Sequence, residues 1–192
     1  MTIAEIMKKM ITFSNGNIHD IDHFLHVWSY AKMIGELEQI DPETQYILEV
    51  AAITHDIACP LCREKYGNTN GKHQEEEGIP LVTDFLSDTG MTKEQIERVA
   101  YLVGHHHTYT DIDGMDYQIL VEADFLVNYF EDHLETESIK KSVKKIFKTE
   151  TGIRIATEMF FPEEFQMSDT WAQDGLQELD DFIEAQGIYI RQ

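Results

Sequence analysis

Two nearly apolar stretches of the sequence carry ionisable side chains where buried helices are expected. The segment 46–58, YILEVAAITHDIA, contains His55 and Asp56, and the segment 119–130, ILVEADFLVNYF, contains Asp124. Apolar residues recur around them at the spacing of a helix. A buried carboxylate costs several kcal/mol unless it is paired or binds a metal. Because these segments hold few Lys or Arg residues, the sequence predicts that a cation binds His55, Asp56 and Asp124.

The rest of the chain also predicts helices. Apolar residues recur at helical spacing in 20–38, and Pro42 favours the first turn of a helix that extends to about Ile57. Thr92 and Gln95 form a capping-box pattern at the start of a helix that ends near His106. Further helices are expected from near Lys72 through Leu86 and at about 116–133, 136–148, 150–160 and 170–186, with loops at 59–71 and 107–116. These patterns predict a single all-α domain over residues 1–192.

Composition limits the classes of partner. With 192 residues the chain can build one sizeable core, and it contains no apolar run near the roughly 20 residues that cross a bilayer. The N-terminus lacks a secretory signal, so a cytoplasmic location without membrane contact is expected. The formal net charge of −21, from 15 Lys and Arg against 36 Asp and Glu, argues against binding of a nucleic-acid duplex through a basic patch. An anionic substrate would need local positive charge, which a bound metal supplies.

The order of histidines and aspartates resembles a known family. His23, then His55 with Asp56, then Asp124 resemble the four-ligand H…HD…D pattern of HD-domain phosphohydrolases. HDIDHFLHVWSYA resembles the opening helix of that family, VAAITHDIA resembles its A-A-L-L-H-D-I-G stretch, and VEADFLVN resembles its D-A-D-x-L motif. The resemblance covers about residues 17–135. It implies a five-helix core in which these four residues hold a divalent metal, manganese or iron, with a helical extension over 136–192.

Further histidines resemble those of members of this superfamily that bind two metals. His73 matches the histidine after the HD motif, and the run from His105 to His107 supplies the other. His106 is favoured within that run because it continues the buried stripe of the preceding helix. Asp56 would then bridge two metals. The alternative is one metal per chain, with His73 and His106 binding substrate phosphate, and His19 is expected to orient a ligand.

The resemblance implies metal-assisted hydrolysis of a small phosphorylated molecule, a phosphomonoester or a phosphodiester, with nucleotides among the candidates. Asp56, His73 and His106 are the expected catalytic residues, and Lys72 and Arg63 are candidates for neutralising phosphate. Two alternatives stay open. One is a diiron oxygenase of the same superfamily, because all six ligand positions are present. The other is a metal-dependent module that binds a nucleotide without turning it over.

The sequence departs from the family after its HD motif. Where many members have glycine and then a basic residue, this chain has Ala58 and Cys59. Cys59 and Cys62 are expected to be incidental thiols in a loop, with contact to the metal site left open. Apolar residues of the C-terminal third, Met159, Phe160, Phe161 and Trp171, are expected to pack in a core, and a homodimer contact through them stays open.

Overall fold

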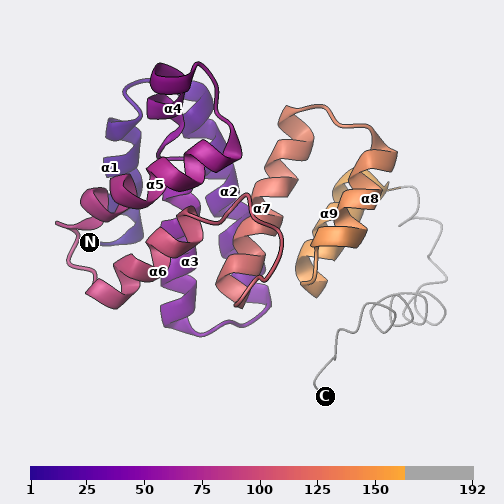
Figure 1. Cartoon of the computed structure of the whole chain (residues 1–192). Helices are drawn as coiled ribbons and strands as arrows, with labels where there is room; N and C mark the ends of the chain where they lie inside the picture. Colours follow the sequence, from indigo (N-terminus) through magenta and orange to yellow (C-terminus); the bar gives the residue numbers. More distant parts are fainter. Residues whose placement is uncertain (163–192) are drawn as a thin grey trace. The chain divides into compact units, whose positions relative to one another are not determined.

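The computed structural model describes residues 1–162, and every regular element in that range is a helix (Figure 1). The all-α class predicted from the sequence is therefore confirmed. The helix expected at 170–186 and Trp171 lie outside the described residues. Within residues 1–162, none of the helices has the length and apolar character needed to cross a membrane. The helices in this part of the chain are α1 Ile3–Phe13, α2 Ile18–Leu37, α3 Pro42–Thr54, α4 Cys59–Tyr66, α5 Gly71–Leu86, α6 Lys93–Val103, α7 Met115–Glu131, α8 Thr136–Ile146 and α9 Glu150–Phe160.

The chain divides into two compact units. The first, called the core unit here, comprises Met1–His133, and the second begins at Leu134. The second unit contains α8 and α9, which pack against each other. All residues proposed from the sequence as metal ligands belong to the core unit. The expectation that residues 1–192 act as one domain stays a prediction.

Local side-chain chemistry explains where several helices begin. The predicted capping box of Thr92 and Gln95 is present at the start of α6. An equivalent box of Thr2 and Glu5 begins α1, a helix that is missing from the predicted set although Ile6, Met7 and Met10 stand at helical spacing. Asp41 caps α3 with its side chain, and Pro42 occupies the first turn as expected.

The prediction of a loop for residues 59–71 is wrong over its first half. Residues Cys59–Tyr66 form α4, since Pro60 is compatible with the first turn of a helix as well as with a loop. Gly67 ends this helix in the left-handed conformation, with φ of 71°. As a result, Cys59 and Cys62 lie on a helix, and both are buried free thiols.

Two of the helices expected to carry ligand residues end three residues earlier than the sequence predicts. Helix α3 ends at Thr54 and α6 ends at Val103. His55 and Asp56 therefore follow the end of α3, and His106 lies three residues beyond the end of α6. The C-terminal end of a helix carries a partial negative charge, which favours cations nearby.

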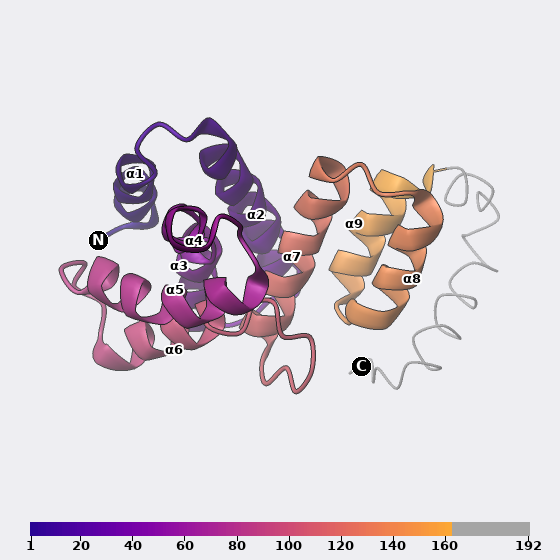
Figure 2. The ribbon, with the colours of Figure 1, turned by 45° about the horizontal axis from the view of Figure 1, so that its top comes forward.

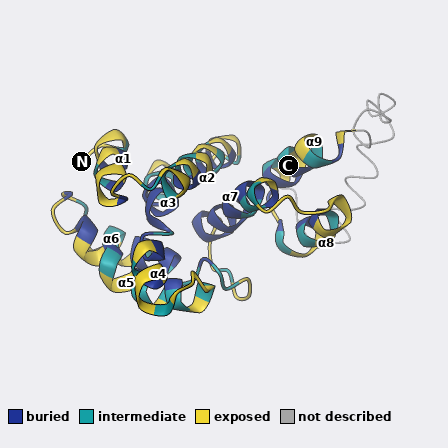
Figure 3. Ribbon diagram, turned by 90° about the horizontal axis from the view of Figure 1, so that it is seen from above, coloured by how far each residue is buried: buried dark blue, intermediate teal, exposed yellow. Residues whose placement is uncertain are grey.

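Helix α3 is the centre of the core unit. Helices α1, α2, α6 and α7 all pack against it (Figures 1 and 2). Every residue from Ile47 to Thr54 is buried, as the dark ribbon of this helix shows in Figure 3. Helix α5 packs against α6 and against α4. His55 and Asp56 are thus placed at the end of a helix whose last eight residues are all buried.

A bidentate ion pair connects α6 to the first turn of α7. Arg98 Nε donates to Asp116 Oδ2 at 2.8 Å, and Arg98 Nη2 donates to Asp116 Oδ1 at 2.7 Å. The Asp116 side chain is only 8% exposed, so its charge depends on this partner. The pair fixes the entry into α7, the helix that carries Asp124.

We predict that Arg98→Ala lowers the free energy of unfolding by about 2 kcal/mol, because it leaves the Asp116 carboxylate buried without its partner. Urea denaturation monitored by circular dichroism measures the change. Lys93→Ala is the matched control, since it breaks an exposed ion pair with Glu97 on the same helix. Equal unfolding midpoints for the two variants would contradict the role given to Arg98.

Candidate metal centre

Four side chains converge at one point of the core unit, which we call the metal centre: His23, His55, Asp56 and Asp124. His23 Nε2 lies 3.1 Å from His55 Nε2 and 3.2 Å from Asp124 Oδ1. Asp56 Oδ2 lies 3.6 Å from His23 Nε2, and Asp124 Oδ1 lies 3.5 Å from His55 Nε2. Atoms that bind a shared ion at about 2.1 Å are themselves about 3 to 3.4 Å apart. The spacing of these donor atoms therefore fits a common divalent ion.

The hydrogen bonds of the two histidines show why a cation belongs here. His55 Nδ1 lies 2.9 Å from the Ala52 carbonyl oxygen, so Nδ1 carries a proton and donates it. His23 Nδ1 lies 3.0 Å from Glu131 Oε2 and donates to that carboxylate. In the neutral rings, both Nε2 atoms then present lone pairs to each other and to two carboxylates. Only a cation between them makes this arrangement favourable, and imidazole with carboxylate suits divalent manganese, iron or zinc.

The pKa values reflect the same charge imbalance. Burial opposes protonation of His23, but its hydrogen bond to Asp124 and the nearby carboxylates raise its pKa to about 10. Burial also favours the neutral form of Asp124, yet the hydrogen bonds to His23 and His55 hold its pKa well below the usual range. The carboxylates are thus ionised and the centre attracts positive charge.

A second group of donor atoms adjoins the metal centre. One ligand atom each from Asp56, His106 and His107 lie within 4.8 Å of one another. The His106 ring is fully buried, and its Nδ1 donates to the Val103 carbonyl oxygen at 2.8 Å. Its Nε2 has no hydrogen-bond partner, although Asp56 Oδ1 lies 3.4 Å away. His107 Nε2 is likewise buried without a partner. This second group can hold another divalent ion, with Asp56 shared between the two positions.

His107 takes the position in this group that the sequence suggested for His73. His73 lies in neither group, and its ring stacks on Tyr66 with the centroids 3.9 Å apart. Burial and the adjacent His106 lower the pKa of His107 to about 4, so its ring is neutral and has a lone pair available. His105 Nδ1 instead lies 2.7 Å from the Tyr101 carbonyl oxygen.

The N-terminal part of α5 holds the His107 segment in place. Glu75 Oε1 accepts from the His107 amide at 3.1 Å and from Thr108 Oγ1 at 3.0 Å. Gly71 permits close packing, since a Cβ at that position would lie 2.7 Å from His107 Cγ. The predicted helix near Lys72 thus contributes to the site through its support of His107.

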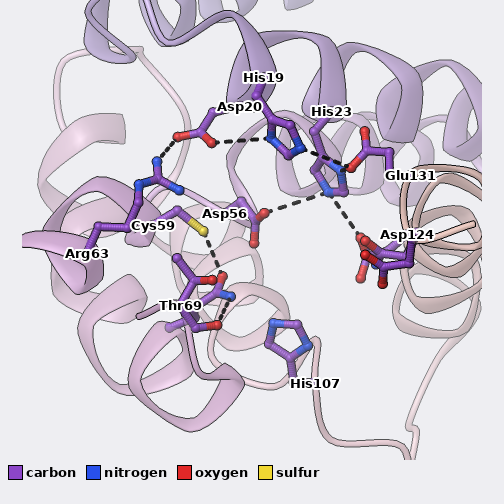
Figure 4. A pocket seen from close by; sticks show the side chains of 13 residues that line it. His19, Asp20, His23, Asp56, Cys59, Arg63, Thr69, His107, Asp124 and Glu131 are labelled. Atoms are coloured by element: carbon purple, nitrogen blue, oxygen red, sulfur yellow. Dashed lines mark hydrogen bonds and ion pairs between the residues drawn. The ribbon is translucent and has the colours of Figure 1, made fainter. Parts of the chain in front are cut away.

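A cavity of about 220 Å³ opens onto the metal centre, and mostly polar side chains line it (Figure 4). Arg63 is the one Lys or Arg among its lining residues and forms an ion pair with Asp20. Lys72, the other candidate for phosphate binding, is 78% exposed and does not line the cavity. The complete lining consists of His19, Asp20, His23, Asp56, Cys59, Arg63, Thr69, Gln74, His107, Asp124, Asn128, Glu131 and Asp132.

Cys59 lies in the cavity wall, at the place where the family pattern has a basic residue. Its Sγ donates to Gln74 Oε1 at 3.2 Å. Burial and the nearby Asp56 carboxylate raise its pKa, so the thiol stays protonated and neutral. Cys59 therefore contributes a weak donor to the cavity and no positive charge.

Sequence reasoning did not choose His107 as a ligand, and it missed Glu131 and Glu75, which contact His23 and the His107 segment. Glu131 follows Asp124 by seven residues, which places both on the same face of α7. That spacing is a usable sign in the sequence. Glu75 has no comparable sign, because its role depends on α5 packing beside the segment that contains His107.

The comparisons with known proteins agree with this fold. A family model described as HD domain matches residues 20–186, and the chain belongs to that family. A crystal structure of a predicted HD superfamily hydrolase from an uncultured Thermotogales bacterium is similar, with a TM-score of 0.58, 24% sequence identity and 92% of each chain covered. A comparison with curated proteins found no significant match.

We predict that the protein binds two Mn²⁺ per chain at saturation, one at the metal centre and one at the second group. His106→Ala and His107→Ala should each reduce this to about one, because the second group loses a donor. Isothermal titration calorimetry on metal-free protein measures the stoichiometry. His73→Ala is the matched control and should keep both ions. Loss of an ion in His73→Ala but not in His107→Ala would reverse the assignment.

Proposed function

We propose that this chain is a metal-dependent phosphohydrolase that acts on a small phosphomonoester or phosphodiester, with nucleotides among the candidate substrates. The observation that carries the proposal is the convergence of His23, His55, Asp56 and Asp124 at the inner end of a polar cavity. Membership of the HD domain family supports it. The similar structure described as a predicted hydrolase is consistent with it.

The metal centre and the second group would hold the ions, and the rest of the chemistry falls to the protein. When bound, a divalent ion acidifies water and polarises a phosphoryl group, which makes hydrolysis feasible near neutral pH. Asp56 presents its two oxygens to different neighbours, with Oδ2 toward His23 and Oδ1 toward His106. Its carboxylate can therefore bind at both positions and fix their relative placement. His55 and His106, both fully buried, keep their rings oriented through main-chain carbonyls.

Substrate binding would use the outer part of the cavity. The Arg63 guanidinium bonds to Asp20 and carries further N–H groups that can donate to phosphate oxygens. Gln74 and Asn128 add amide groups to the lining. The acidic residues of the wall repel an anion, so positive charge from bound metal and from Arg63 is needed for phosphate to enter.

Asp56→Asn should lower phosphohydrolase activity by about a hundredfold or more, because it weakens both ion positions at once. The measurement is hydrolysis of p-nitrophenyl phosphate, bis(p-nitrophenyl) phosphate and a panel of nucleotides and sugar phosphates by the Mn²⁺-loaded protein without oxygen. Circular dichroism checks that the variant keeps its helices. Failure of the wild-type protein to hydrolyse any of these esters would contradict the proposal. Tight nucleotide binding without turnover would indicate a binding module instead.

Arg63→Ala should raise KM for a phosphoester more than it lowers kcat, since the side chain is placed to bind the substrate and lies apart from the metal ligands. Steady-state kinetics on the best substrate of the panel measure both constants. Lys72→Ala is the control, because that lysine does not line the cavity. A larger effect of Lys72→Ala on KM would show that phosphate approaches from another side.

The second group favours one further candidate, a diiron oxygenase. Two ion positions that share Asp56 are the arrangement such chemistry requires. Protein purified without chelators would then contain close to two irons per chain and would consume oxygen with a small organic substrate. Hydrolysis supported by Mn²⁺ without oxygen, and no oxygen uptake by the iron form, would exclude it.

A further inference from the structure

The three fully or largely buried histidines of the site are oriented in the same way but by different partners. In each ring Nδ1 donates a hydrogen bond outward and Nε2 faces the site. For His55 and His106 the acceptor is a main-chain carbonyl oxygen three residues earlier in the chain. For His23 the acceptor is a side chain, Glu131, which comes from a different helix. The orientation of His23 is therefore the only one of the three that a single side-chain replacement can remove.

Glu131 is placed to perform this task without binding the ion itself. It is the last residue of α7, and its Oε2 lies 3.0 Å from His23 Nδ1, whereas Asp124 approaches the other ring nitrogen, Nε2 (Figure 4). Its side chain is 20% exposed, so the bond is largely shielded from solvent. A carboxylate that accepts from Nδ1–H fixes the tautomer of a histidine and strengthens Nε2 as a metal ligand.

We propose that Glu131 is the positioning residue for His23, holding the ring so that its Nε2 lone pair meets the metal ion. The inference rests on the metal centre of the proposed function and concerns metal affinity, whatever ester is hydrolysed. It gives Glu131 the orienting role that the sequence suggested for His19. His19 is 75% exposed, and its Nε2 lies 3.7 Å from Glu131 Oε2, beyond hydrogen-bond distance.

Two replacements of Glu131 separate its hydrogen bond from its charge. Glu131→Ala removes both, whereas Glu131→Gln removes the charge and keeps an oxygen that can accept from Nδ1–H. Asp132→Asn is the matched control for charge. Asp132 also lines the cavity, and its replacement by Asn removes one negative charge. His19→Ala is a second control, because it removes the His19 ring that lies beside the Glu131 carboxylate.

The experiment measures the Kd for Mn²⁺ by calorimetry on the full chain, with circular dichroism melting of each metal-free variant as a check on folding. We expect Glu131→Ala to weaken the tighter Mn²⁺ site by about 10- to 100-fold. Glu131→Gln should recover most of that loss, and Asp132→Asn and His19→Ala should change Kd by about fivefold or less. A Glu131→Ala effect no larger than that of Asp132→Asn would overturn the proposal and leave only a charge effect.

A spectroscopic readout tests the hydrogen bond directly. In Zn²⁺-loaded protein labelled with ¹⁵N-histidine, the wild type and Glu131→Gln should show a slowly exchanging Nδ1–H resonance for His23. The resonance should be lost in Glu131→Ala, and persistence there would also overturn the proposal. Binding of Mn²⁺ without any hydrolysis would contradict the proposed function and leave this inference testable. Failure of the wild type to bind Mn²⁺ would overturn both.

Discussion

The short distance between the Nε2 atoms of His23 and His55 is the constraint on which the rest of the site depends. His23 Nε2 and His55 Nε2 face each other at 3.1 Å, and both rings keep their protons on the opposite nitrogen. Two ionised aspartates lie beside them, and burial removes the water that would otherwise screen this charge. The group is stable only with a cation among its donor atoms. The raised pKa of His23 shows that a proton can take this role, so a metal ion must displace it when it binds.

The helical core supplies this geometry through its helix ends. Helices α3 and α6 end just before the ligand residues, and their last turns present carbonyl oxygens that orient His55 and His106. The partial negative charge at such ends favours a cation. The formal net charge of −21 and the acidic cavity wall act in the same direction. The same charges would repel the phosphorylated substrate of the proposed function, so that function requires the metal to bind first.

The sequence predicts most of this arrangement, for reasons that particular residues show. His55 and Asp124 stand in apolar helical runs, where an unpaired charge is costly, and the order of His23, His55, Asp56 and Asp124 adds the family pattern. The sequence favoured His73 and His106 as further ligands and gave no sign for His107. Helical periodicity favoured His106, which lies in the second group, but it does not indicate His107, and the close packing of Gly71 on His107 is a property of the folded chain. The seven-residue spacing places Glu131 on the same face of α7 as Asp124, but its contact with His23 follows only from the packing of α2 against α7.

The most direct test of the central claim is anomalous X-ray diffraction from crystals of the Mn²⁺-loaded protein, collected on either side of the manganese absorption edge. We predict an anomalous peak between the Nε2 atoms of His23 and His55, in contact with the carboxylates of Asp56 and Asp124. Distances from the peak to these atoms should be about 2.0 to 2.3 Å. A fully loaded crystal whose manganese peaks all lie on other residues, with His23 and His55 still facing each other, would show that these four residues do not form a metal centre.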